Sequence, residues 1–179
     1  MANPLFGTTS MHAAALFAKL GDERAKKFFE DFAANGGRIL SSNGEVRRRV
    51  ALGEFAVGLT DTDDFNVARQ DGKPVGVVYP DSDGMGTLIV PNCAVLIAGG
   101  PNPAAAKQFV DYLLSPAVEQ ALAESEAAQM PVRKDVPTPP HVVTLDKIKP
   151  MEVDYTALSA RLDDLTKGFL KEWVDRHIR

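Results

Sequence analysis

Three short polar segments, each at the start of a helical pattern, constrain the fold of this chain more than any other feature. They are residues 8–10, 41–43 and 60–63, and each follows a loop or a short apolar run. A repeated order of apolar run, polar turn and amphipathic stretch is typical of α/β units. The sequence therefore predicts an α/β fold in which helices flank a mixed sheet.

Residues typical of helix N-caps and C-caps predict where the helices begin and end. Helices are predicted over 7–20 and 22–34, and Ser42 begins another with the S-x-x-E capping pattern that ends at Glu45. Further helices should begin at Asn102-Pro103 and Ser115-Pro116, and one long helix should run over 154–178 with Asp154 as its cap. Strands are expected over 38–40, 55–59, 74–79 and 87–97, and the proline-rich residues 130–150 should form an irregular linker.

Composition excludes several functions. The net charge is −4 among 179 residues, so the chain has no overall attraction to nucleic acid. A single cysteine, Cys93, cannot form an intramolecular disulfide. The first residues lack the basic and apolar regions of a secretion signal, and no apolar run is long enough to span a bilayer.

No catalytic motif is found. His12, His141 and His177 are widely separated and form no zinc-binding pattern. The glycine-containing turns match neither a dinucleotide-binding loop nor a P-loop. The sequence predicts no cofactor and no enzymatic activity.

The polar helix starts are the candidate binding site. Ligands of open α/β sheets lie where strands end and helix N-termini point free N–H groups, although such residues can also simply cap their own helices. Carboxylates in the third segment would suit a metal ion or an amine, with Asp61 and Asp63 as possible metal ligands. The predicted ligand-binding residues are Thr8, Thr9, Ser10, Ser42, Asn43, Thr62 and Asp63.

Three stretches carry a resemblance to a known family: residues 3–9 (NPLFGTT), 86–92 (GTLIVPN) and 101–116 (PNPAAAKQFVDYLLSP). They resemble the extracellular solute-binding proteins of ABC transporters, in the ferric-ion-binding branch. That resemblance implies a type II periplasmic-binding-protein lobe, a periplasmic location, and delivery of a small solute or metal ion to a membrane permease. Ferric binders carry paired tyrosines where this chain has Thr62 and Asp63, so an oxyanion or organic solute is as well supported as iron.

The resemblance also implies a division of the chain. Residues 1–85 would form most of the second lobe, and residues 86–179 would supply a hinge-crossing strand and helices that pack on a first lobe. This chain would then be the C-terminal half of a longer protein. Because apolar surface would be left uncovered, we expect two copies to associate through residues 87–179.

Two other functions remain open from the residues alone. The first is the effector-sensing domain of a regulator, although no DNA-binding segment is present. The second is a small hydrolase in which Asp61 or Asp63 acts as a base together with His12.

Overall fold

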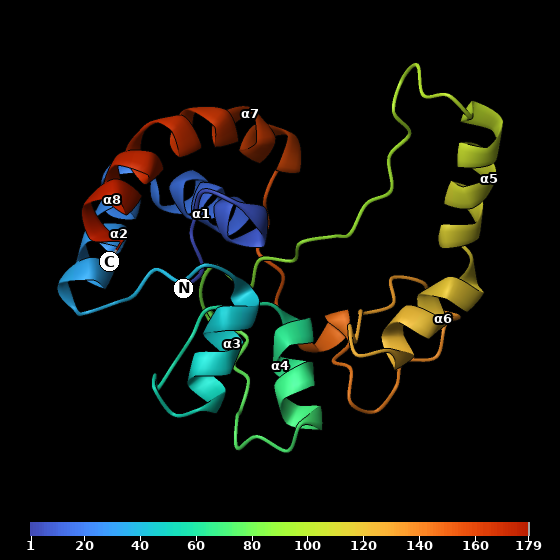
Figure 1. The fold of residues 1–179 in the computed structure, drawn as a ribbon, viewed down its shortest axis with the longest axis horizontal. Coiled ribbons are helices and arrows are strands. Elements are labelled where there is room, and N and C mark those ends of the chain that lie inside the picture. The colour runs from blue at the N-terminus through green and yellow to red at the C-terminus, as the bar shows by residue number, and fades with distance from the viewer. Residues whose placement is uncertain (179) are drawn as a thin grey trace.

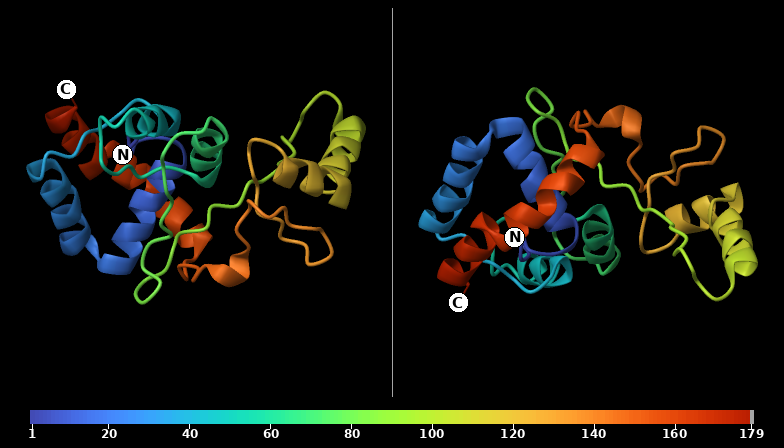
Figure 2. Two further views of the ribbon diagram at one scale, coloured as in Figure 1. Left: turned by 90° about the horizontal axis from the view of Figure 1, so that it is seen from below. Right: turned by 90° about the horizontal axis from the view of Figure 1, so that it is seen from above.

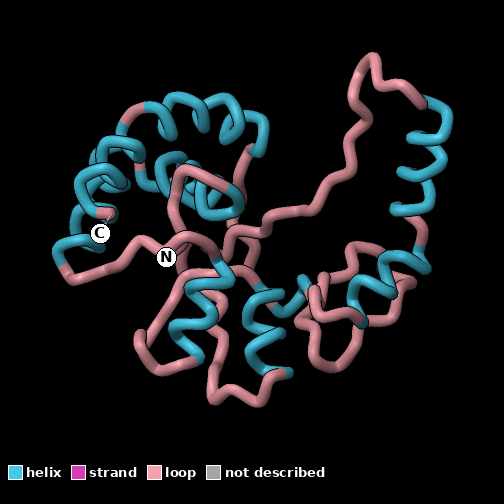
Figure 3. The backbone as a smooth tube through the Cα atoms, in the orientation of Figure 1, coloured by secondary structure: helices cyan, strands magenta, loops and turns pink. Residues whose placement is uncertain are grey.

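The computed structural model describes residues 1–178 as helices and loops (Figures 1 and 3). Helices begin where the sequence predicts: Ser42 accepts a hydrogen bond from the Glu45 backbone N–H at 3.1 Å, and Asp154 caps the helix that follows it. The elements are α1 (Gly7–Leu20), α2 (Asp22–Ala34), α3 (Asn43–Ala51), α4 (Thr62–Gln70), α5 (Pro103–Leu113), α6 (Pro116–Glu124), the 3-10 helix η1 (Leu145–Lys147), α7 (Tyr155–Lys167) and α8 (Phe169–His177).

The predicted α/β fold is wrong for residues 1–178, because none of the four expected strands forms there. Within the described part of the chain, the only β pairing consists of two isolated parallel bridges, Ala2 with Leu40 and Thr87 with Pro150. A strand needs a neighbouring strand to take up its backbone N–H and C=O groups, and apolar composition alone cannot supply one. Segments such as 88–98 therefore run as loops (Figure 3).

The first and last parts of the chain pack on each other. Helix α7 lies against α1, and α8 lies against α2 (Figures 1 and 2). Phe17, Phe29 and Trp173 are buried between them, and the ring centroids of Phe29 and Trp173 are 5.1 Å apart in an edge-to-face arrangement. Burial of large aromatic side chains is the main source of stability available to such a small core. This packing fixes the orientation of α1 and therefore the position of its N-terminus.

The long helix predicted over 154–178 is broken into two. Gly168 has φ −102° and ψ −116°, outside the helical region, and it separates α7 from α8. Glycine tolerates this conformation because it has no Cβ. The break allows α8 to turn toward α2, which brings Trp173 beside Phe29.

Helices α3 and α4 pack on each other below this core, whereas α5 and α6 lie at the other end of the molecule (Figures 1 and 2). Asn66 of α4 links the two ends. It is 2% exposed, and its Nδ2 donates to the Glu126 carbonyl oxygen at 3.0 Å. The bridge between Thr87 and Pro150 joins the segment that leads to α5 with the segment that returns to α7. Gly86 (φ +86°) allows this close approach, because a Cβ there would lie 2.7 Å from the Lys149 carbonyl oxygen. The division of the chain at residue 85 stays a prediction.

A large apolar surface remains uncovered. Helix α5 has no buried residue, and Val95 and Ile97 in the preceding loop are 80% and 83% exposed. At about 25 cal/mol per Å², an apolar patch of a few hundred Å² left in water costs several kcal/mol. Such a surface is typical of a region that packs against another polypeptide.

We expect this chain to form a homodimer through residues 87–179, because a second copy can cover the exposed loop and α5. Light scattering behind a sizing column should give twice the 19.3 kDa of one chain. The double change Val95→Asp and Ile97→Asp should shift the protein to a monomer by placing charge in the contact.

Val57→Asp is the matched control, since Val57 is 86% exposed but lies far from this segment in the sequence. It should leave the dimer intact. A wild-type protein that stays monomeric at micromolar concentration would contradict the prediction. If Val57→Asp breaks the dimer equally, the interface does not lie in residues 87–179.

Candidate functional site

The N-termini of α1, α3 and α4 meet in one hydrogen-bonded cluster. Thr8 donates its hydroxyl to both carboxylate oxygens of Asp61, at 3.0 and 2.8 Å. Asn43 donates from Nδ2 to Asp61 Oδ2 at 2.7 Å and to Thr8 Oγ1 at 3.0 Å. All three side chains are half-buried. This Thr8–Asn43–Asp61 network joins three segments that are 18 to 53 residues apart in the sequence.

A hollow of about 210 Å³ lies beside this network, between the starts of α1 and α3. We call it the α1–α3 hollow. No residue that lines it is charged, and the polar side chains are short. Such a surface can hydrogen-bond a polar solute through hydroxyl, amide and free backbone groups. Its lining residues are Ala2, Asn3, Phe6, Gly7, Thr8, Thr9, Ser41, Ser42 and Asn43.

The predicted ligand-binding residues do not all lie together. Thr8, Thr9, Ser42 and Asn43 line the α1–α3 hollow. Ser10 is 4% exposed and donates to the Gly7 carbonyl oxygen at 2.8 Å, so its hydroxyl is engaged within its own helix. The sheet edge on which these residues were expected does not exist in residues 1–178; helix packing brings them together instead.

The acidic start of α4 places three carboxylates close together. Oxygen atoms of Asp61, Asp63 and Asp64 lie within 4.8 Å of one another. Two of the three are already engaged, Asp61 by the network and Asp64 by the Thr60 hydroxyl at 2.8 Å. Burial raises the pKa of Asp64, and the negative charges of Asp63 and Asp61 add to this. A metal ion held by Asp61 and Asp63 would therefore have to compete with the Thr8 and Asn43 hydrogen bonds.

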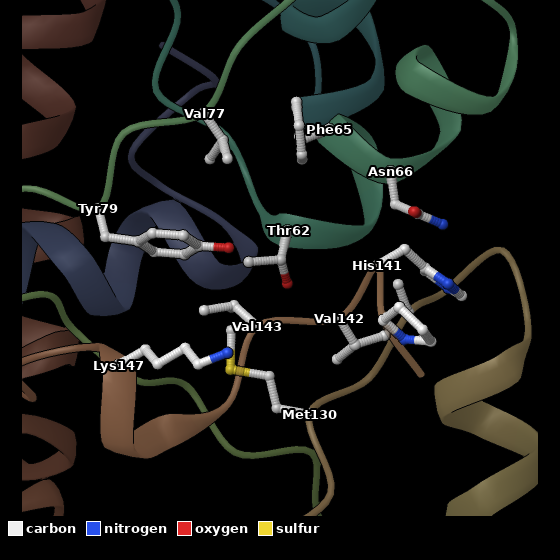
Figure 4. Close-up of a pocket in the computed structure, with 12 residues that line it drawn as sticks. Thr62, Phe65, Asn66, Val77, Tyr79, Met130, His141, Val142, Val143 and Lys147 are labelled. Atoms are coloured by element: carbon white, nitrogen blue, oxygen red, sulfur yellow. The ribbon is translucent and has the colours of Figure 1, made fainter. Parts of the chain in front are cut away.

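Thr62 faces a different space, which we call the α4 pocket. This cavity of about 270 Å³ lies between α4 and the loop that leads to η1 (Figure 4). In Figure 4 the hydroxyl of Tyr79 points toward Thr62, and Lys147 extends along the opposite wall toward Met130. The lining residues are Thr62, Phe65, Asn66, Val77, Tyr79, Ala128, Met130, Pro140, His141, Val142, Val143 and Lys147.

Sequence reasoning missed most of the α4 pocket. Tyr79 was assigned to a strand, and Lys147 lies in the proline-rich segment 130–150. The two residues are far apart in the chain and share no motif, so no local signal could place them together. Of the three tyrosines, Tyr79 lines the α4 pocket, whereas Tyr112 is 62% exposed on α5 and Tyr155 donates to the Ile89 carbonyl oxygen.

His12 lies one turn after Thr8 on α1 and is half-buried. Burial lowers the pKa of His12 below its usual range, and the negative charges of Asp61 and Asp81 oppose this effect. The imidazole is therefore favoured in its neutral form in the folded protein. Among the described residues, Asp61 accepts hydrogen bonds from Thr8 and Asn43 and none from His12, the partner that the hydrolase hypothesis requires.

Comparison with known proteins identifies the family. The sequence profile of the family described as bacterial extracellular solute-binding proteins matches residues 3–150. The chain belongs to this family. Its members are generally non-catalytic, and the family implies a periplasmic or extracellular location. No helix within residues 1–178 has both the length and the hydrophobicity to cross a bilayer.

One curated relative of this solute-binding chain comes from Haemophilus influenzae (strain ATCC 51907 / DSM 11121 / KW20 / Rd) and is described as an uncharacterized protein. It is 25% identical over 176 residues, which cover 97% of this chain and 49% of the relative. The chain thus spans about half the length of the curated relative it matches. No solved structure matches this chain significantly.

The Thr8–Asn43–Asp61 network should contribute measurably to stability. Thr8→Val keeps the side-chain shape but removes both hydrogen bonds to Asp61. We expect urea denaturation to show a loss of about 1.5–3 kcal/mol, as for hydrogen bonds to a charged partner. Thr9→Val is the control, because Thr9 makes only a long 3.4 Å contact with Asn43. Equal losses in the two variants would contradict this role of Asp61.

His12 should make stability depend on pH in a defined direction. Below the ordinary histidine pKa of about 6.5, the unfolded chain protonates His12, whereas burial makes the folded chain resist protonation. The free energy of unfolding should therefore decrease as pH falls from 7.5 toward the lowered folded-state pKa. His12→Gln, which stays neutral throughout, should show a smaller decrease in parallel urea denaturations at pH 7.5 and 5.5. An identical pH dependence in both proteins would assign the effect to other groups.

Proposed function

We propose that this chain is the solute-capturing component of an ABC transporter, acts in the periplasm and passes a small solute to a membrane permease. Membership of the solute-binding family carries this proposal. The convergence of three polar helix N-termini beside the α1–α3 hollow and the α4 pocket supports it. Helix N-termini supply free N–H groups, and short hydroxyl and amide side chains add hydrogen bonds without filling the space.

This proposal has two candidate ligand sites, the α1–α3 hollow and the α4 pocket. Thr8, Thr9, Ser42 and Asn43 would contact solute from the α1–α3 hollow, and Thr62 from the α4 pocket. Asp61 would hold Thr8 and Asn43 in place through its hydrogen bonds. The Asp63 carboxylate, at the start of α4, would be available to bind an amine or a cation. Solute-binding sites of this kind gain specificity from a few polar groups fixed in position.

The whole protein is proposed to be longer than this chain, because the H. influenzae relative is about twice as long. A second lobe would then complete the site. Cleft-closing binders take contacts from both lobes, so residues 1–179 alone should bind the same solute more weakly than the complete protein.

A metal ion is the second candidate solute, favoured by the three neighbouring carboxylates of Asp61, Asp63 and Asp64. The tyrosine pair of ferric binders is replaced by Thr62 and Asp63, and only one tyrosine, Tyr79, lies nearby. Ferric ion prefers anionic oxygen ligands that are free to coordinate. The hydrogen bonds already made by Asp61 and Asp64 weigh against this candidate.

A thermal-shift screen tests the function directly. A panel of organic acids, sugars, amino acids, oxyanions and metal ions should contain a solute that raises the melting temperature, since a ligand bound only by the folded state stabilises it. Deletion of the gene should reduce cellular uptake of that same solute.

Asn43→Ala should reduce the thermal shift, because it breaks the network beside the hollow. Asn35→Ala is the control: Asn35 bonds only to the Asp31 carbonyl oxygen at the end of α2. If no solute class shifts the melting temperature, or if uptake of every solute is unchanged in the deletion strain, the proposed function is wrong.

A further inference from the structure

We propose that the α4 pocket binds a small organic anion, with a carboxylate head held by Lys147 and Tyr79 and an apolar body lodged between α4 and the loop after residue 128. This inference rests on the proposed function and names the class of solute. It concerns residues that the sequence pattern did not single out, since Lys147 and Tyr79 belong to no motif.

The charge of the lining residues indicates that the ligand is an anion. Lys147 is the one lining residue with a permanent charge, and none of the residues that line the pocket is acidic. Within residues 1–178, Lys147 makes no ion pair and no side-chain hydrogen bond, whereas Lys149 close by donates to the Gly84 carbonyl oxygen at 2.7 Å. An unpaired ammonium group at the wall of a cavity favours an anionic partner.

Asp146, the carboxylate adjacent to Lys147 in the sequence, forms no salt bridge with this exposed lysine within residues 1–178. Asp146 precedes it in η1, and its pKa is lowered chiefly by a hydrogen bond from the Thr144 side chain, then by its own backbone, with the charge of Lys147 a smaller cause. Two of the three carboxylates at the start of α4 are engaged with other side chains, Asp61 with Thr8 and Asn43, and Asp64 with Thr60. The ammonium group therefore remains available to a ligand.

Two hydroxyl groups, those of Thr62 and Tyr79, also line the pocket. Tyr79 directs its hydroxyl toward Thr62, and both side chains are half-buried (Figure 4). Burial raises the pKa of Tyr79, so its hydroxyl stays protonated at neutral pH and can donate a hydrogen bond. One ammonium and two hydroxyl groups match the acceptor capacity of a carboxylate.

The remaining walls suit an apolar body. Phe65, Val77, Met130, Val142 and Val143 surround the polar side chains in Figure 4. A cavity of about 270 Å³ accommodates a small solute rather than a peptide or a sugar chain. A hydrated metal ion or inorganic phosphate would leave these apolar walls without contacts, so the lining favours an organic anion.

The two walls are held at a fixed separation. Asn66 is 2% exposed and donates to the Glu126 carbonyl oxygen, while its own side-chain oxygen accepts from Arg69 at 3.0 Å. The first of these bonds ties α4 to the segment that leads to Met130, and the second lies within α4. A pocket with pre-positioned walls loses less entropy when it binds a ligand.

Isothermal titration of the full chain provides the test. The probes are hexanoate and benzoate, their neutral amides hexanamide and benzamide, inorganic phosphate, and Mn²⁺. We expect a carboxylate to bind at least about tenfold more tightly than its amide, because a charge-assisted hydrogen bond is lost in the amide. Phosphate and Mn²⁺ should bind more weakly than the carboxylate.

Lys147→Met should weaken carboxylate binding by about tenfold or more, and Tyr79→Phe by a smaller factor. Lys149→Met is the matched control: it removes the same charge two residues away and should leave the affinity within about twofold of wild type. Circular dichroism melting of each variant separates loss of the ligand contact from loss of folding, and Tyr79→Phe keeps the test decisive if Lys147→Met is unstable.

Several results would overturn the inference: no binding of either carboxylate, equal binding of carboxylate and amide, or equal effects of Lys147→Met and Lys149→Met. Tighter binding of Mn²⁺ or phosphate would assign the pocket to another solute class. A solute found in the thermal-shift screen that still binds the Lys147→Met protein would overturn the pocket assignment and leave the proposed function standing. A screen in which no solute binds would reject both.

Discussion

The burial of Trp173 against Phe29 is the contact on which the rest of the structure depends. Trp173 has no exposed surface, and it comes from the last helix, whereas Phe29 and Phe17 come from the first two. Without sheet pairing in residues 1–178, these aromatic contacts bury apolar area between distant parts of the chain. The break at Gly168 makes the contact possible because it turns α8 toward α2.

The orientation of α1 that follows from this core determines the polar site. Once α1 is fixed against α7, Thr8 at its start meets Asp61 and Asn43 from the α3–α4 pair. A half-buried carboxylate is stable there only because hydroxyl and amide donors replace the water it loses. The same donors occupy Asp61, so the groups left free to bind a solute lie in the uncharged α1–α3 hollow and in the separate α4 pocket.

The two ends of the molecule differ in how completely they are packed. Helices α1, α2, α7 and α8 share one core, whereas α5 has no buried residue and the loop before it exposes Val95 and Ile97. A solute-binding protein assembled from two lobes would present such uncovered surface in either half alone. The α4 pocket lies where these two ends meet, with α4 on one wall and the 128–147 segment on the other (Figure 4).

Local signals in the sequence determined the helices: the Ser42 and Asp154 caps, the Asn102-Pro103 start and the glycine after α1 all lie where the structure has helix ends. They act within a few residues, so they can be read directly from the chain. The family stretches likewise indicated a solute-binding protein. The strands could not be predicted, because a ladder requires a partner that an apolar run such as 88–97 cannot specify by itself. Nor could the hydrogen bond between Thr8 and Asp61, or the presence of Tyr79 and Lys147 in one pocket, because only tertiary packing over long sequence separations brings those side chains together.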